Sequence, residues 1–197
     1  MERYRIEGLS DLVFGLALSI GSLAMISQPV NNLSDITDGL LQFFFSFLII
    51  VSVWVAYTKI VSEIKIESSW DFRLNLGLLM LVAIEPYLLF LLGHNDPEIL
   101  EWASMAYALD VGLIMAILAG LFSRKKEQGT SEATILQNRF ERNRYIGISL
   151  VFLISALPFL WVPSVVGTIN LRFIIWMFAI MPGLTLRVLH HRAMRKV

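Results

Sequence analysis

Long apolar stretches dominate the pattern of hydrophobic and polar positions along the chain. A bilayer core about 30 Å thick is crossed by roughly 20 mostly apolar residues in an α-helix. Six stretches of about that length lack clustered charge, and they predict transmembrane helices at about 8–27, 36–62, 73–93, 99–123, 144–162 and 168–188. We therefore expect an all-α integral membrane protein with one domain over residues 1–197 and a polar linker at about 124–143.

The composition agrees with lipid as the solvent. Hydrophobic residues make up 56% of the chain and charged residues 16%, against roughly 25% charged in a typical soluble domain. A formal net charge of zero argues against a nucleic-acid partner, which would call for a basic surface. There is no cysteine, and we find no nucleophile beside a base, no metal constellation and no cofactor loop. We therefore expect no enzyme activity, no cofactor and no bound metal.

The basic residues are segregated between the two sides of the predicted bundle. The connections at about 29–35, 94–98 and 163–167 contain no lysine or arginine. Of the 16 basic residues, all except Arg172 fall on the other side in a six-helix arrangement. Because cytoplasmic loops carry an excess of lysine and arginine, both termini are predicted to be cytoplasmic.

The first helix carries a narrow stripe of regularly spaced residues. Leu12, Leu16, Ser19 and Leu23 are separated by four, three and four positions, which places them on one face of a helix. Periodicity alone is compatible with an ordinary packing face as well as with a functional surface. The stripe is therefore a candidate site with two interpretations.

Polar residues gather where the first helix begins. Ser10 and Asp11 suit a helix cap, because free backbone amides and the positive end of the helix dipole lie there. Arg5 and Asp11 are six positions apart and so lie on different faces. Each is expected to tie this helix to another one, because polar groups at membrane depth need partners.

These residues resemble a known family. The segment from Arg5 to Asp11, with Leu9 and Ser10 inside it, is similar to the Arg-x-x-x-Phe-Ser-Asp signature of the prokaryotic transmembrane protein 175 family, which are relatives of the endosomal and lysosomal potassium channel. The run Ser46-Phe47 and the later Trp54-Val55-Ala56-Tyr57 resemble the family's Ser-Phe and Trp-x-x-His patterns, with Tyr57 in place of histidine. Leu74-Asn75-Leu76 also looks like the family pattern. The resemblance covers the first three helices.

The resemblance implies a homotetrameric potassium channel in the plasma membrane of a prokaryote, with the first helices lining a central pore and potassium ions as the permeating partner. By position in the family pattern, Leu16 corresponds to the main apolar constriction, Ser19 to a hydroxyl ring and Leu23 to an outer apolar ring. Leu12 is expected to line the inner pore. Arg5, Leu9, Ser10 and Asp11 are expected to support the pore helix, with Trp54 and Asn75 as their hydrogen-bonding partners.

Two carboxylates in the middle of predicted helices leave a second interpretation open. Glu85 and Asp110 lie near the centres of the third and fourth helices, and intramembrane carboxylates are functional candidates because their burial is costly. Arg172 is a possible partner for one of them. A structural ion pair and proton coupling are comparably plausible, so a small proton-coupled secondary transporter is the alternative to a channel.

Overall fold

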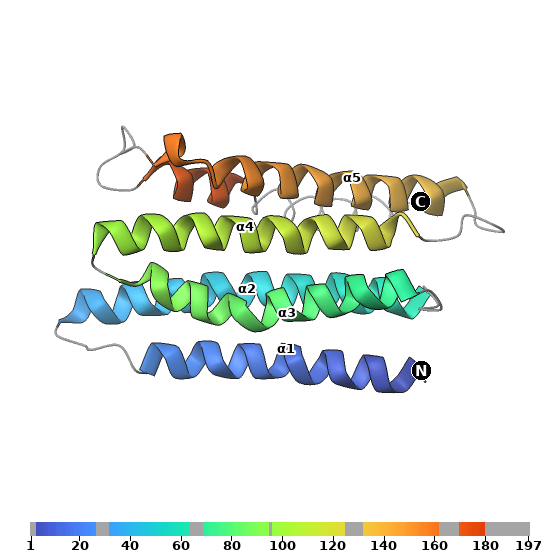
Figure 1. The fold of residues 1–197 in the computed structure, drawn as a ribbon, viewed down its shortest axis with the longest axis horizontal. Helices are drawn as coiled ribbons and strands as arrows, with labels where there is room; N and C mark the ends of the chain where they lie inside the picture. The colour runs from blue at the N-terminus through green and yellow to red at the C-terminus, as the bar shows by residue number, and fades with distance from the viewer. Residues whose placement is uncertain are drawn as a thin grey trace, which may run out of the picture.

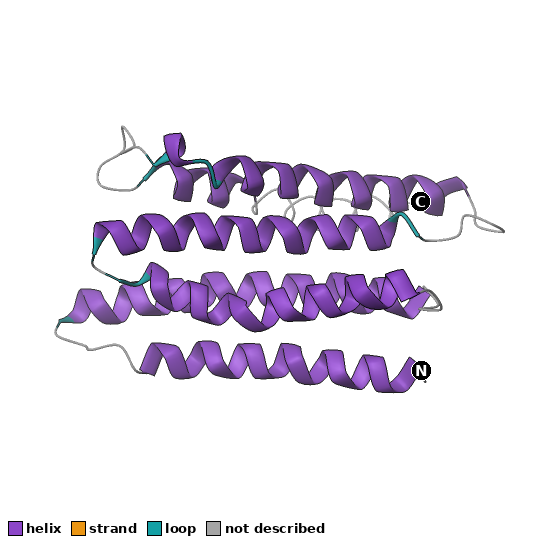
Figure 2. Cartoon of the chain, viewed as in Figure 1, coloured by secondary structure: helices purple, strands orange, loops and turns teal. Residues whose placement is uncertain are grey.

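The structure is a computed structural model that describes residues 3–26, 32–63, 69–94, 96–124, 132–161 and 170–179. The described part of the chain is a bundle of long helices, as expected for an all-α membrane protein (Figures 1 and 2). The elements are α1 (Arg3–Ile26), α2 (Leu33–Glu63), α3 (Ser69–Leu92), α4 (Pro97–Phe122), α5 (Glu132–Ser155) and the short 3-10 helix η1 (Pro158–Leu160). Residues 171–179 are also helical.

Four of these helices are long and apolar enough to cross a membrane. Their candidate spans are Arg5–Leu23, Asp35–Ser62, Ser69–Leu92 and Pro97–Phe122. Each overlaps one of the first four predicted helices, so the chain is a multi-pass membrane protein. The sixth predicted helix, 168–188, is described only in part, where residues 171–179 are helical.

The predicted start of the fifth helix, at about residue 144, is wrong. Helix α5 begins at Glu132, inside the segment that was expected to be a linker. That segment is polar but rich in residues with high helix propensity, and Arg144 makes an ion pair of 2.9 Å with Glu141 one turn earlier. The helix ends at Ser155 because Pro158 follows and Leu157, next to it, is extended. The polar first half explains why α5 is absent from the candidate spans.

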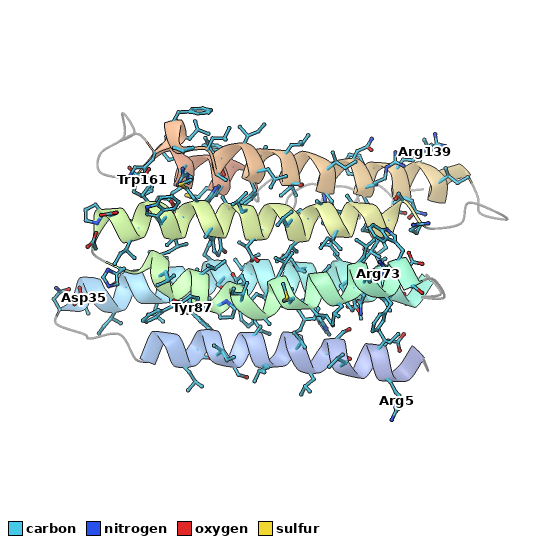
Figure 3. The ribbon with its side chains drawn as sticks, viewed as in Figure 1. Arg5, Asp35, Arg73, Tyr87, Arg139 and Trp161 are labelled. Carbon is cyan, nitrogen blue, oxygen red and sulfur yellow. The ribbon has the colours of Figure 1, made fainter. Side chains whose placement is uncertain are left out.

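The helices are arranged so that α1 lies at one edge of the bundle (Figure 1). Helix α3 packs between α1 and α4, α2 also packs on α1, and α5 covers the far side of α4. Arg5, Arg73 and Arg139 lie at one end of the bundle, whereas Asp35 and Trp161 lie at the other (Figure 3). The described residues thus show the segregation of basic charge that the sequence predicts.

Local sequence features fix α4 in place. The Asp96 carboxylate accepts a hydrogen bond from the amide of Glu98 at 2.9 Å, and Pro97 follows as the first helical residue, where its missing amide hydrogen costs nothing. Further along, Ser149 of α5 donates a hydrogen bond of 2.8 Å to the carbonyl of Gly112. A Cβ atom at Gly112 would lie 2.8 Å from Leu153, so glycine is what lets α4 and α5 approach this closely.

Candidate ion pathway and the contacts that support it

The first helix has one buried and one exposed face. Phe14 and Ala17 are 2% and 1% exposed where α1 meets the rest of the bundle. Leu12, Leu16 and Leu23 are 67%, 56% and 64% exposed on the other side. The stripe found by periodicity is therefore a continuous outer surface on the edge helix. Such a surface contacts either lipid or further copies of the chain, so its role as a pore lining stays a prediction.

Ser19 places a hydroxyl oxygen on this exposed stripe. Its hydroxyl hydrogen is used within the helix, because Ser19 donates a bond of 2.9 Å to the carbonyl of Gly15, one turn earlier. The lone pairs of the same oxygen remain available to an outside donor or cation. Ser22 on the same helix also bonds backward, to the carbonyl of Leu18 at 2.9 Å, but it is only partly exposed.

The base of α1 is held to α2 by a buried hydroxyl pair. Ser10 is completely buried, donates 2.8 Å to the carbonyl of Ile6, and lies 2.6 Å from the hydroxyl of Tyr57. The single hydrogen of Ser10 points to Ile6, so Tyr57 is the donor in the second bond. The Phe14 and Tyr57 rings also pack, with centroids 5.6 Å apart. Sequence reasoning noted Tyr57 only as a departure from the family histidine and missed it as the partner of Ser10.

The remaining motif residues surround this pair. Trp54, an expected partner, donates a hydrogen bond of 3.0 Å from its indole nitrogen to Asp11. Asn75 of α3 is 2% exposed and lies near the Tyr57 hydroxyl, but its Oδ1 has no hydrogen-bond partner among the described residues. Leu9 is 46% exposed, and Arg5 points away from the other helices of the chain (Figure 3). The two residues thus lie on the outer side of α1, away from the rest of the described bundle.

A second polar cluster lies inside the subunit and centres on Glu85. This carboxylate is 1% exposed, receives the Ser46 hydroxyl at 2.8 Å on Oε1 and 2.9 Å on Oε2, and accepts the Tyr107 hydroxyl at 3.1 Å. Its donors come from α2 and α4, so Glu85 of α3 joins three helices. Sequence reasoning missed this role for Ser46 and Tyr107, because neither position is marked by spacing on its own helix.

The other intramembrane carboxylate is different. Asp110 is 4% exposed, and neither of its carboxylate oxygens has a hydrogen-bond partner within the described residues. It is close enough to Glu85 for the two groups to interact electrostatically. Asp110 is therefore a buried polar group that the described residues leave without a hydrogen-bond partner.

Arg172 does not pair with Glu85 or Asp110, a possibility that the sequence left open. The Arg172 guanidinium donates to the carbonyls of Glu101 at 3.4 Å and Leu157 at 3.0 Å, and to the Ser104 hydroxyl. It also lies over the Trp161 ring, 5.3 Å from the centroid. Arg172 lies near the start of the helix at 171–179, beside the first turns of α4. Glu85 and Asp110 lie closer to the middle of the bundle, where Arg172 does not contact them.

The described residues contain no group of three or more metal-ligating side chains placed to hold an ion. The arrangement in this part of the chain is instead a helical membrane bundle with an exposed apolar stripe and one hydroxyl on its edge helix. These features define a multi-pass membrane protein with buried polar ties between its helices.

Comparison with known proteins finds one family that matches part of the sequence and one solved structure with a similar fold. Residues 5–86 match the family described as endosomal/lysosomal potassium channel TMEM175. The fold is similar to the crystal structure of a lysosomal potassium-selective channel TMEM175 homolog from Chamaesiphon minutus, with a TM-score of 0.65 and 24% identity over 93% of this chain and 97% of that one. No curated protein matches the chain significantly. The resemblance seen in the sequence is therefore confirmed: residues 5–86 carry the TMEM175 family sequence, and the chain has the fold of a TMEM175 homolog.

Proposed function

We propose that this chain is the subunit of a potassium-selective channel, in which α1 helices from four copies surround a central pore. The observation that carries the proposal is the position of the Leu12, Leu16, Ser19 and Leu23 stripe. These residues lie on the open face of the edge helix, while the opposite face of α1 is buried in the bundle. The family match over residues 5–86, which include the whole of this stripe, supports the same reading.

In this arrangement the pore selects ions without a filter of backbone carbonyls. Four copies of Leu16 form an apolar neck that closes by losing its water, and Leu23 forms a second apolar ring further out. Ser19 offers a ring of hydroxyl oxygens to a partly dehydrated cation, because its hydrogen is already bonded to Gly15. Potassium sheds its hydration water more readily than sodium, so a narrow apolar pore favours potassium.

The proposed orientation places the basic end of the bundle in the cytoplasm of a prokaryote and the protein in the plasma membrane. Arg5, Arg73 and Arg139 share this end (Figure 3). Both termini are then cytoplasmic, and Leu12 lies on the inner side of the Leu16 neck.

The test is flux of potassium and sodium through the purified chain in liposomes. Ser19→Ala is expected to lower the preference for potassium, whereas Ser22→Ala is the matched control on the same helix and is expected to leave it unchanged. An unaltered potassium preference in Ser19→Ala would contradict the selectivity role. Absence of potassium flux in the wild-type protein would contradict the channel itself.

A proton-coupled transporter is the second candidate. The observation that favours it is the Asp110 carboxylate, which has no hydrogen-bond partner among the described residues. A transporter would give saturable flux with a fixed coupling ratio, whereas a channel gives unitary currents. Under the channel proposal, Asp110→Asn leaves potassium flux in place. Loss of proton-coupled flux in that variant would instead support the transporter.

A further inference from the structure

The exposed stripe of α1 continues toward the start of the helix. Leu9 lies three positions before Leu12, and Arg5 lies four positions before Leu9, so the alternation of three and four is kept. Both added side chains are exposed, Leu9 to 46%. At 100° per residue, all positions of the extended stripe fall within about 80° of one another. Arg5 therefore belongs to the same face of α1 as the proposed pore lining.

The charge of Arg5 is not compensated within the described part of the subunit. Figure 3 shows its side chain pointing away from the other helices, and no described residue forms an ion pair or a hydrogen bond with its guanidinium. Glu7 lies about 160° round the helix, on the side of Tyr57. The Asp11 carboxylate lies about 9 Å further along the helix and accepts the indole hydrogen of Trp54.

The beginning of α1 adds positive charge of its own. The helix begins at Arg3, so its free backbone amides lie at the same end as Arg5, and its first turn contains no acidic residue. The helix dipole places roughly half a positive charge at this end. With four α1 helices round one axis, four Arg5 side chains and four helix N-termini lie at the cytoplasmic mouth of the pore.

We propose that the four Arg5 side chains form a ring of positive charge that limits the entry of potassium from the cytoplasm. The inference rests on the channel and the orientation proposed above. A surface potential of about one kT lowers the local concentration of a monovalent cation about threefold. Arg5 lies about 16 Å from Leu16 along the helix, beyond the Debye length of about 8 Å at physiological salt. The ring therefore acts on the supply of ions to the pore, and the choice between potassium and sodium is made further along, at Leu16 and Ser19.

The experiment is single-channel recording in inside-out patches from giant spheroplasts that express the full chain, with equal potassium chloride on both sides. The wild type is expected to carry less current outward than inward at matched voltages. At about 0.15 M salt, Arg5→Gln should raise the outward current about threefold, whereas Arg5→Lys keeps the charge and should keep the wild-type ratio. At about 1 M salt the Debye length falls to about 3 Å, so wild type and Arg5→Gln should carry the same outward current.

Arg73→Gln is the matched control, because Arg73 is an exposed arginine at the same end of the bundle but lies on α3, off the stripe. It should leave the outward current unchanged. An unaltered outward current in Arg5→Gln would overturn the inference, and so would an equal rise in Arg73→Gln.

The wild type alone gives a further test, which needs no variant to fold. A ratio of outward to inward current that does not change between about 0.15 M and 1 M salt would also overturn the ring. Potassium currents that ignore Arg5 would count against the ring and leave the channel in place. Absence of potassium current in the wild type would overturn both.

Discussion

The buried pair of Ser10 and Tyr57 gives the sharpest prediction about how α1 is held in place. Ser10 uses its only hydrogen on the carbonyl of Ile6, so Tyr57 must donate to Ser10. Ser10→Ala therefore leaves the hydroxyl of Tyr57, which is 2% exposed, without its Ser10 partner. Tyr57→Phe removes the donor and leaves the Ser10 hydrogen still bonded. The two substitutions remove the same hydrogen bond with unequal consequences.

The magnitudes follow from what each change leaves behind. Loss of an ordinary hydrogen bond costs about 1 kcal/mol, so Tyr57→Phe should lower the free energy of unfolding by about that amount. A buried group left without a partner costs about 1–3 kcal/mol, so Ser10→Ala should cost about 2 kcal/mol. In the double variant the Tyr57 hydroxyl that lost its Ser10 partner is gone as well, and the total cost should be well below the sum of the two single costs.

The assay is reversible unfolding in mixed micelles, with sodium dodecyl sulfate as the denaturant and all four proteins measured together. The expected order of destabilisation is Ser10→Ala above Tyr57→Phe, with a double variant that is less destabilised than the sum. Strict additivity of the two changes would refute the reasoning, since it would mean that the two hydroxyl groups do not interact. Thr58→Val, on the exposed side of α2, is a control expected to change little.

Three further predictions concern other contacts and use the same unfolding assay. Gly112→Ala should destabilise the protein by about 1–3 kcal/mol, because the new methyl group would lie 2.8 Å from Leu153; unchanged stability would contradict the close approach of α4 and α5. Asp110→Asn should leave the free energy of unfolding unchanged or raise it, because a neutral amide replaces a carboxylate with no hydrogen-bond partner among the described residues. A decrease in the free energy of unfolding of more than about 2 kcal/mol would show that Asp110 has a hydrogen-bond or ion-pair partner. Trp54→Phe should cost less than about 1 kcal/mol, because its bond to Asp11 lies at the surface of the subunit and not in its core. A larger loss of stability would show that this contact is a main tie between α1 and α2.

Much of the architecture could be predicted from apolar length and periodicity. Spans of about 20 apolar residues are detectable in the sequence because the bilayer leaves no alternative to a helix. The stripe of Leu12, Leu16, Ser19 and Leu23 could be predicted because residues spaced by three and four positions share one face of a helix. In the structure this face of α1 is exposed. What occupies that face depends on neighbouring copies, which a single chain does not specify.

The beginning of α5 was missed for a physical reason. Hydropathy identifies helices that lipid stabilises, whereas residues 132–143 form a helix through local propensity and the pair of Glu141 and Arg144. The polar contacts were missed for another reason. Tyr57, Ser46 and Tyr107 reach partners 47, 39 and 22 positions away, and such pairs depend on how the helices face one another.

The central claim is that α1 helices from several subunits surround one axis. The chain has no cysteine, so a single Leu16→Cys substitution gives one thiol per subunit. Oxidation of this variant in membranes is predicted to yield disulfide-linked dimers, while Leu150→Cys on the exposed face of α5, far from α1, stays monomeric on denaturing gels. Cross-linking at position 150 with none at position 16 would contradict the account.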